Sequence, residues 1–351
     1  ILSGLVGSEM CIRDSLLDVS MLSKQWKISI APMLDWTDRH YRYLVRLLTK
    51  HTRLYTEMVH ACALIYGAQQ EKLLQHRLIE HPLALQLAGN EPNQLAQACL
   101  VAKNYGFAEV NLNAGCPSEK VQKGAFGAIL MKDTMRLAAC LNAMQQAVDL
   151  PITLKHRIGI DQEQSYEWLR DFVGEIAHRT MCRVFIVHAR NAWLKGLSPK
   201  ENRQIPPLKY DYVYRLKQDF PNLTVILNGG ITSHESIKRH LQQVDGVMIG
   251  REAYHHPMFV RDWDTLFFAD NKNDFSLEKL IERFFTYAKE ELALYPEVKL
   301  RDIVKSSLGL LANQRGGKVW RQYLSNPEHL KTNDPQLILD AFLAVKEKRL
   351  G

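Results

Sequence analysis

Short β-prone runs alternate with amphipathic helical stretches from residue 28 to about residue 250, and no other feature restricts the possible folds as strongly. Parallel strands need a crossover, usually a helix, before the next strand can pair. Eight strand-and-helix repeats in this length therefore predict a (β/α)8 TIM barrel, with an open doubly wound sheet as the alternative. The predicted strands are 28–33, 54–56, 83–87, 109–113, 152–156, 184–188, 224–228 and 246–249, and helices are predicted at 39–49, 91–105, 134–148, 165–177 and 210–220.

The pattern changes at a polar connector, residues 269–274. Beyond it the periodicity predicts only helices, at 277–294, 298–312, 319–325 and 335–349. We therefore expect a barrel domain over 21–273 and a smaller all-helical domain over 274–351. Residues 1–20 fit neither pattern, and no cationic segment precedes their apolar start, so we expect a non-native or disordered leader rather than a signal peptide.

Composition excludes several classes of protein. No apolar run approaches the roughly 20 residues that cross a bilayer. The six cysteines form no C-x-x-C pair and no Cys/His cluster at metal-ligand spacing, which predicts free thiols in a reducing cytosol and no metal. The net charge of +7 permits a polyanionic partner without requiring one. No feature fixes an oligomeric state, and a monomer is the expectation.

Functional residues of such barrels lie at the C-terminal ends of the strands. Cys116 follows the predicted strand 109–113 and stands between Gly115 and Pro117, which fix the backbone at a strand exit. A thiol at this place is a candidate acid or nucleophile. The alternative is a buried, inert cysteine.

Two further strand ends predict a phosphate site. Asn228, Gly229 and Gly230 end one strand, and Gly250 and Arg251 end the next. Flexible backbone N–H groups and one guanidinium at these loops suit the place where such barrels commonly hold a phosphate. The alternative is that the glycines only make turns.

Three polar residues predict contacts to a flavin. Lys155 and His188 end adjacent strands, and a cation near the N1 and C2 carbonyl of a flavin stabilises the charge of the reduced ring. The amide of Gln86 suits the pyrimidine edge of the ring. The alternatives are a surface lysine, a satisfied core histidine and a hydrogen bond at the rim.

Two stretches concentrate the positive charge. Residues 190–209 carry a net +4 around Trp193, and residues 299–321 carry a net +5 and include Trp320. We expect them to flank one groove over the barrel mouth that suits a phosphate backbone. The alternative is two solvated basic faces.

Residues 21 to about 349 resemble the tRNA-dihydrouridine synthases, most closely their A subfamily. The resemblance rests on segments in order: APMLDWTDRHYR (31–42), YTEMV (55–59), LQLAGN (85–90), NLNAGCPSEKVQKGAFGAILM (111–131), TLKHRIGID (153–161), VHARNAWLKGLSPKENRQIPPL (187–208), NGGI (228–231), MIGREAY (248–254) and W-R-x-Y-L-S (320–325). It implies an FMN-binding barrel with a helical tRNA-binding domain. Such an enzyme uses NADPH to reduce the C5=C6 bond of uridines 20 and 20a in the tRNA D-loop.

The resemblance also implies roles for single residues. Cys116 matches the proton donor. The implied FMN contacts are Pro32, Met33, Leu34, Gln86, Lys155, His188, Asn228, Gly229, Gly230, Gly250 and Arg251, and the implied tRNA contacts are Asn113, Lys200, Arg203, Lys318 and Arg321. Lys318 stands where an arginine is expected, so a single charge there replaces a bidentate fork.

The chemistry agrees with these roles. Adding H₂ across an electron-poor alkene needs a hydride on C6 and a proton on C5 from opposite faces, so a reduced flavin and an acid must flank the base. Two other functions stay open: a dihydroorotate- or enoate-type FMN oxidoreductase acting on a small substrate, and a non-catalytic RNA-binding protein.

Overall fold

The structure is a computed structural model that describes residues 25–119, 122, 124–270 and 275–350. The expected leader, residues 1–20, lies outside the described residues, as does most of the connector 269–274. None of the helices formed by the described residues has both the length and the apolar character that a bilayer span requires.

Eight strands form one sheet, in the order β1-β8-β7-β6-β5-β4-β3-β2. The pairs from β3 to β8 are parallel, and the N–H of Ile30 in β1 donates to the carbonyl of Arg53, directly before β2, at 2.9 Å. This bond links the two ends of the sheet order, and the predicted barrel is confirmed. The strands are β1 Ile28–Ile30, β2 Leu54–His60, β3 Leu83–Ala88, β4 Glu109–Ala114, β5 Ile152–Arg157, β6 Val184–His188, β7 Thr224–Asn228 and β8 Gly246–Ile249.

Two strand predictions need correction. β1 ends at Ile30, so residues 31–33 belong to the following loop, and β2 continues to His60, so Thr56 and Glu57 lie inside the strand rather than at its end. Thr37 explains the early end of β1. Its hydroxyl accepts a hydrogen bond from the N–H of Met33 at 2.9 Å and donates to the carbonyl of Met33 at 3.1 Å, which replaces strand pairing by a turn.

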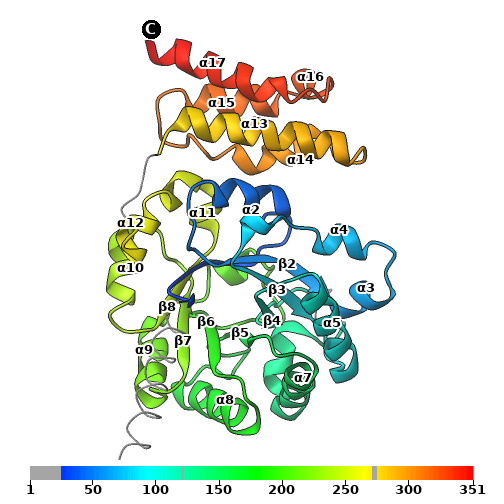
Figure 1. Cartoon of the computed structure of the whole chain (residues 1–351). Coiled ribbons are helices and arrows are strands. Elements are labelled where there is room, and N and C mark those ends of the chain that lie inside the picture. The colour runs from blue at the N-terminus through cyan, green and yellow to red at the C-terminus, as the bar shows by residue number, and fades with distance from the viewer. Residues whose placement is uncertain (1–24, 120–121, 123, 271–274, 351) are drawn as a thin grey trace, which may run out of the picture. The chain divides into compact units, whose positions relative to one another are not determined.

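The strands are buried on both sides, as parallel strands usually are. Every residue of β3 and β4 is buried. Helices α5, α7, α8 and α9 lie outside the strands (Figure 1). Because side chains alternate between the two faces of a strand, every second residue of β4 points into the barrel. These residues are Glu109, Asn111 and Asn113, all polar.

Side chains before the first turn fix the start of several helices. Asp38 accepts from the N–H of Tyr41, Asp133 from that of Arg136, and Ser165 from that of Trp168, which satisfies N–H groups that a helix leaves unpaired. The helices of this part are α2 Arg39–Arg46, α3 Ala61–Tyr66, α4 Gln70–Leu74, α5 Pro92–Asn104, α7 Thr134–Ala147, α8 Tyr166–Arg179, α9 Tyr210–Asp219, α10 His234–His240, α11 Arg251–His255 and α12 Trp263–Phe268.

The residues after 275 form helices, as predicted, with one correction. The predicted helix 298–312 is wrong, because α14 covers only Leu300–Val304 and a 3-10 turn follows at Lys305–Ser307. A Cβ on Gly309 would lie 2.3 Å from the carbonyl oxygen of His255, so the backbone packs against another segment here. The other helices are α13 Leu277–Leu294, α15 Gly317–Ser325, α16 Pro327–Leu330 and α17 Gln336–Leu350.

The chain divides into two compact units, and neither is continuous in sequence. The first holds the described residues up to Ser29, Met58–Leu74 and Ala84–Ile249, and the second holds Ile30–Glu57, Gln75–Leu83 and the described residues from Gly250 onwards. The core of the second unit joins Tyr43 and Leu44 of α2 to buried residues of α13, α15 and α17. A domain boundary at residues 273/274 stays a prediction.

Candidate functional site

Cys116 lies two residues beyond the end of β4 on a loop that is held from two sides. The N–H groups of Gly115 and Cys116 donate to Oδ1 of Asn113 at 3.1 and 3.0 Å. The carbonyl of Cys116 accepts from the N–H of Ala128 at 2.9 Å. The thiol is half-buried, whereas three other cysteines, Cys99, Cys140 and Cys182, are fully buried. The loop therefore presents this sulfur at the C-terminal end of the barrel instead of enclosing it in the core.

Arg157 is a residue of this site that the sequence did not single out. It is 4% exposed, its Nε donates to the carbonyl of Gly115 at 3.1 Å, and its Nη1 donates to the carbonyls of Asn191 and Asn202 at 3.1 and 2.8 Å. One guanidinium thus joins the loop that carries Cys116 to the loop after β6. The alternation Thr153, Lys155, Arg157 along β5 placed Arg157 on the same face as Lys155, and this was the signal available in the sequence.

Burial lowers the pKa values of both Lys155 and His188. Burial lowers the pKa of Lys155 to about 7, with a contribution from Arg157, while the nearby Cys116 acts in the opposite direction. Burial and the cations Arg157 and Lys155 hold the pKa of His188 well below its usual range, so its imidazole is neutral. Among the residues that the structure describes, Nδ1 of His188 is buried and has no hydrogen-bond partner. A buried polar atom without a partner favours a bound group that supplies one.

Gln86 and Asn113 lie inside the barrel and bond to one another. Nδ2 of Asn113 donates to Oε1 of Gln86 at 3.0 Å, and Nε2 of Gln86 donates to Oδ1 of Asn111 at 2.8 Å. Gln86 is 1% exposed and Asn113 is 9% exposed. Asn113, the expected tRNA contact, therefore also holds the Cys116 loop.

The end of β7 needs glycine. Gly229 and Gly230 have φ angles of 116° and 70°, which L side chains rarely adopt. A Cβ on Gly230 would lie 2.5 Å from Cδ1 of Leu208 and 2.8 Å from Oη of Tyr210. The hydroxyl of Tyr210 donates to the carbonyl of Gly229 at 2.9 Å and fixes this turn. Asn228 is buried and donates from Nδ2 to the carbonyl of Met248 at 2.7 Å.

The other expected FMN contacts belong to the second compact unit, whereas Cys116 and Lys155 belong to the first. Leu34 is 63% exposed, and Gly250 directly precedes α11. That both sets form one site stays a prediction. The expected contacts in the second unit are Pro32, Met33, Leu34, Gly250 and Arg251.

The basic loop after β6 is built around one buried amide. Asn202 is fully buried, accepts from the N–H of Trp193 at 2.8 Å and donates to the carbonyls of Trp193 and Leu197 at 2.9 and 3.0 Å. The flanking side chains of Lys200 and Arg203 are exposed. The buried amide thus fixes the backbone while the cations face solvent.

Helix α15 carries the second pair of expected tRNA contacts. Lys318 and Arg321 are exposed and stand three residues apart, so they share a face of the helix. Trp320 is buried, and its Nε1 donates to the carbonyl of Ser307 at 2.8 Å. Lys200 and Lys318 belong to different compact units, so a single groove between the two basic stretches stays a prediction.

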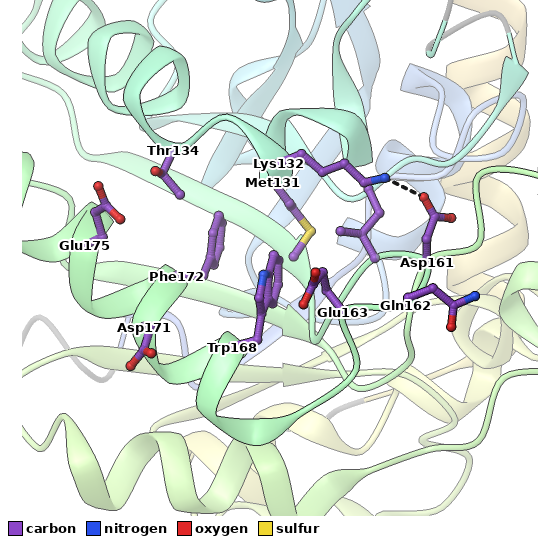
Figure 2. A pocket seen from close by; sticks show the side chains of 11 residues that line it. Met131, Lys132, Thr134, Asp161, Gln162, Glu163, Trp168, Asp171, Phe172 and Glu175 are labelled. Atoms are coloured by element: carbon purple, nitrogen blue, oxygen red, sulfur yellow. Dashed lines mark hydrogen bonds and ion pairs between the residues drawn. The ribbon is translucent and has the colours of Figure 1, made fainter.

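A cavity of about 510 Å³ lies beside α8, and Asp161 in its lining connects it to the basic loop after β6. Figure 2 shows carboxylates around it and Trp168 beside Phe172, whose rings stack with centroids 5.5 Å apart. Nζ of Lys132 contacts Oδ2 of Asp161 at 2.7 Å, and Oδ1 of Asp161 accepts from the N–H of Leu194 at 2.9 Å. The acidic lining is unsuited to a phosphate, and neither Cys116 nor Lys155 lines it.

One cluster brings three side chains that could bind a metal together within the described residues, although the sequence predicted no metal. His51, Asp264 and Asp270 place one ligand atom each within 4.8 Å of the others. The carboxylate of Asp264 already accepts from the Thr49 hydroxyl at 2.5 Å and from the N–H of Lys50 at 2.7 Å. These bonds give Asp264 a structural role, because they connect the first turn of α12 to the residues that follow α2. We therefore assign no cation to the cluster.

A family model described as dihydrouridine synthase matches residues 29–346. Three proteins named tRNA-dihydrouridine(20/20a) synthase are 46% identical to this chain. The protein of Vibrio parahaemolyticus aligns over 322 residues, 92% of this chain and 98% of the relative. The protein of Salmonella typhimurium aligns over 324 residues, which are 92% of this chain and 96% of the relative. The protein of Shewanella oneidensis aligns over 318 residues, which are 91% of this chain and 93% of the relative.

Among solved structures, morphinone reductase is similar with a TM-score of 0.50 at 12% sequence identity, over 72% of this chain and 88% of that structure. At this identity the likeness shows the barrel fold alone.

Proposed function

The chain belongs to the dihydrouridine synthase family, and from that premise we propose that it is an FMN-dependent oxidoreductase that reduces the C5=C6 bond of uridines 20 and 20a in tRNA with NADPH. One observation carries the proposal beyond family membership. A half-buried thiol stands on a fixed loop at the C-terminal end of the barrel, and its electrostatic environment includes Lys155 and Arg157. An acid thus stands beside a cation where parallel barrels hold their substrates.

The residues present fit FMN. The unpartnered Nδ1 of His188 lacks a polar contact that a ring or phosphate oxygen of FMN would provide. The glycines at the end of β7 support a phosphate site, because backbone with positive φ can direct N–H groups toward an anion, and the space around Gly230 leaves no room for a side chain. Bound FMN supplies the hydride for C6 of the uracil. The residues that would hold it are Pro32, Met33, Leu34, Gln86, Lys155, His188, Asn228, Gly229, Gly230, Gly250 and Arg251.

Cys116 supplies the proton for C5. An ordinary thiol is protonated at neutral pH and can release its proton to a developing enolate. The charge of Arg157, whose pKa is lowered only to about 10, stabilises the thiolate that remains, because opposite charges in a partly buried site attract strongly. The protonated fraction of Lys155, whose pKa is about 7, adds to this attraction. Asn113 and Arg157 hold the loop so that the sulfur keeps its place during the transfer.

The tRNA is held through its phosphates. A uridine inside folded tRNA must be turned out before a buried site can reach it. The exposed cations Lys200, Arg203, Lys318 and Arg321 suit the phosphates around that base. The site of action would be the cytoplasm, where tRNA is modified, and the enzyme would act as a monomer.

The test is the variant Cys116→Ala. We expect it to bind FMN and tRNA as the wild type does but to form dihydrouridine about 10²- to 10⁴-fold more slowly, the usual contribution of a general acid. Cys62→Ala is the control, because Cys62 is also half-buried but lies in α3, where its thiol donates to Oε1 of Gln94 in α5. Full activity of Cys116→Ala would overturn the role of the thiol.

The small-substrate alternative explains the flavin residues equally well but gives the exposed basic side chains no use. The two are separated by measuring NADPH oxidation with and without unmodified tRNA. We expect flavin reoxidation to accelerate only when tRNA is present. Fast turnover with a small enoate or dihydroorotate and none with tRNA would favour the alternative, and a protein that binds no flavin would favour a non-catalytic RNA-binding role.

A further inference from the structure

A continuous chain of hydrogen bonds runs through the barrel from its N-terminal end to the loop of Cys116. Each link is a direct bond between protein groups, and the chain involves three strands, β3, β4 and β5. At the loop, the N–H groups of Gly115 and Cys116 donate to Oδ1 of Asn113 at 3.1 and 3.0 Å. Nδ2 of Asn113 donates to Oε1 of Gln86 at 3.0 Å, and Nε2 of Gln86 donates to Oδ1 of Asn111 at 2.8 Å. Nδ2 of Asn111 donates to Oγ1 of Thr153 at 2.7 Å, and Oγ1 of Thr153 donates to Oε1 of Glu109 at 2.5 Å.

The chain has one possible direction. At the upper end two backbone N–H groups can only donate, so Asn113 must present its oxygen to them. At the lower end the carboxylate of Glu109 accepts on both oxygens, because Oε2 also accepts from Nε1 of Trp26 at 2.7 Å. The hydroxyl of Thr153 must therefore give its single hydrogen to Glu109 and accept from Asn111. The orientation of every amide between these ends follows.

The members of this chain are deeply buried. Glu109, Asn111 and Thr153 are each 0% exposed. The interior of such a barrel is usually filled by branched apolar side chains, so a polar column is costly unless every member is satisfied. Satisfied and aligned, the hydrogen bonds polarise one another and strengthen the whole chain.

Distance excludes a direct chemical role for the lower members. Glu109 precedes Asn113 by four residues on β4, which is about 13 Å at the rise of a strand. A base in the mouth of the barrel cannot touch Glu109. Any effect of Glu109 or Thr153 on the reaction must pass through the amides above them.

We infer that Glu109 and Thr153 are positioning residues: they lock the amides of Asn111, Gln86 and Asn113 in one orientation and so hold the Cys116 loop in place for proton transfer. The inference rests on the proposed role of Cys116. It assigns a function to two residues outside the mouth, and it gives the buried polar column a use.

The test compares Thr153→Val with Thr153→Ser. Valine keeps the shape of threonine but can neither accept from Asn111 nor donate to Glu109, whereas serine keeps the hydroxyl. We expect Thr153→Val to lower kcat about 10- to 100-fold, the usual effect of a misplaced reacting group, with KM for tRNA unchanged. Thr153→Ser should stay within about twofold of the wild type, because its hydroxyl makes the same bonds.

Amide hydrogen exchange of residues 113–118 provides a readout that needs no activity. We expect this segment to exchange faster in Thr153→Val and as in the wild type in Thr153→Ser. Equal values of kcat and equal exchange in the two variants would overturn the inference, since the hydroxyl would then be irrelevant.

A second variant covers the case in which Thr153→Val does not fold. Glu109→Gln keeps the shape but turns an N–H group toward either Trp26 or Thr153, so the fixed direction is lost. Faster exchange at residues 113–118 with a lowered kcat supports the inference, and wild-type values of both overturn it. A wild-type protein that forms no dihydrouridine would instead refute the proposed function, while the exchange comparison would still decide whether the chain positions the loop.

Discussion

Replacing Arg157 by lysine should loosen two loops of the barrel mouth together. The guanidinium of Arg157 donates to one carbonyl of the Cys116 loop and to two carbonyls of the loop after β6, at 2.8 to 3.1 Å. A single ammonium group cannot reproduce this fork, because its donors radiate from one atom. In the Arg157→Lys variant the bridge between the two loops is therefore lost, so that neither loop is held in place by the other.

The loss of local stability in Arg157→Lys follows from the number of hydrogen bonds that lysine cannot make. Lysine keeps one of the three contacts, and each lost hydrogen bond from a charged donor costs about 1.5 kcal/mol or more, so roughly 3 kcal/mol of local stability is lost. Since 1.4 kcal/mol is a factor of ten, the opening of the loops should become about 100-fold more frequent. Burial lowers the pKa of Arg157 only to about 10, so the wild-type guanidinium stays charged at neutral pH.

The assay is amide hydrogen exchange of the segments 113–118 and 190–204, together with the rate at which iodoacetamide alkylates Cys116. We expect all three to accelerate. Arg183→Lys is the matched control, because Nη1 of Arg183 also donates to three carbonyls, those of Ala177, Thr180 and Cys182, before β6. Acceleration in only one of the two segments, or equal effects in Arg157→Lys and Arg183→Lys, would refute the argument that Arg157 couples the loops.

Two other predictions concern charge. Replacing Lys200, Arg203, Lys318 and Arg321 by glutamine should weaken tRNA binding and leave flavin binding intact. The slope of log Kd against log salt concentration should fall by up to about 0.9 for each lost phosphate contact. An unchanged slope in a filter-binding titration would contradict this prediction. Burial raises the pKa of Asp38 from 3.8 to about 6, so the folded protein holds this proton more tightly than the unfolded chain does. Above pH 6 the ionised carboxylate therefore lowers the free energy of unfolding, and this loss is recovered as the pH falls through 6. Asp38→Asn keeps an oxygen that accepts from the N–H of Tyr41, so it should raise the free energy of unfolding by roughly 1–3 kcal/mol at pH 8 and by little at pH 4. If urea titrations give an increase in this free energy that does not vary with pH, burial of the charge is not the cause.

The architecture was predictable because it depends on patterns between near neighbours in the chain. The alternation of strand and helix predicted the barrel, and three strands, β6, β7 and β8, have the predicted bounds. The break at Gly115 and Pro117 placed Cys116 at a strand exit for the same reason. Boundaries were less predictable where a single side-chain bond or a close backbone contact decides them. Thr37 ends β1 early, and the close approach of Gly309 to His255 breaks a segment whose periodicity is helical.

The sequence by itself determined the barrel, the place of Cys116 and the family likeness, since each is written in local periodicity or in the order of short segments. Only the tertiary structure showed that Arg157 joins two loops and that Glu109 connects through Thr153 to the Cys116 loop. These contacts join residues 42 to 45 positions apart. They depend on the register between β4 and β5 and on the way loops meet at the end of a closed sheet, and neither can be derived from the spacing of residues along one strand.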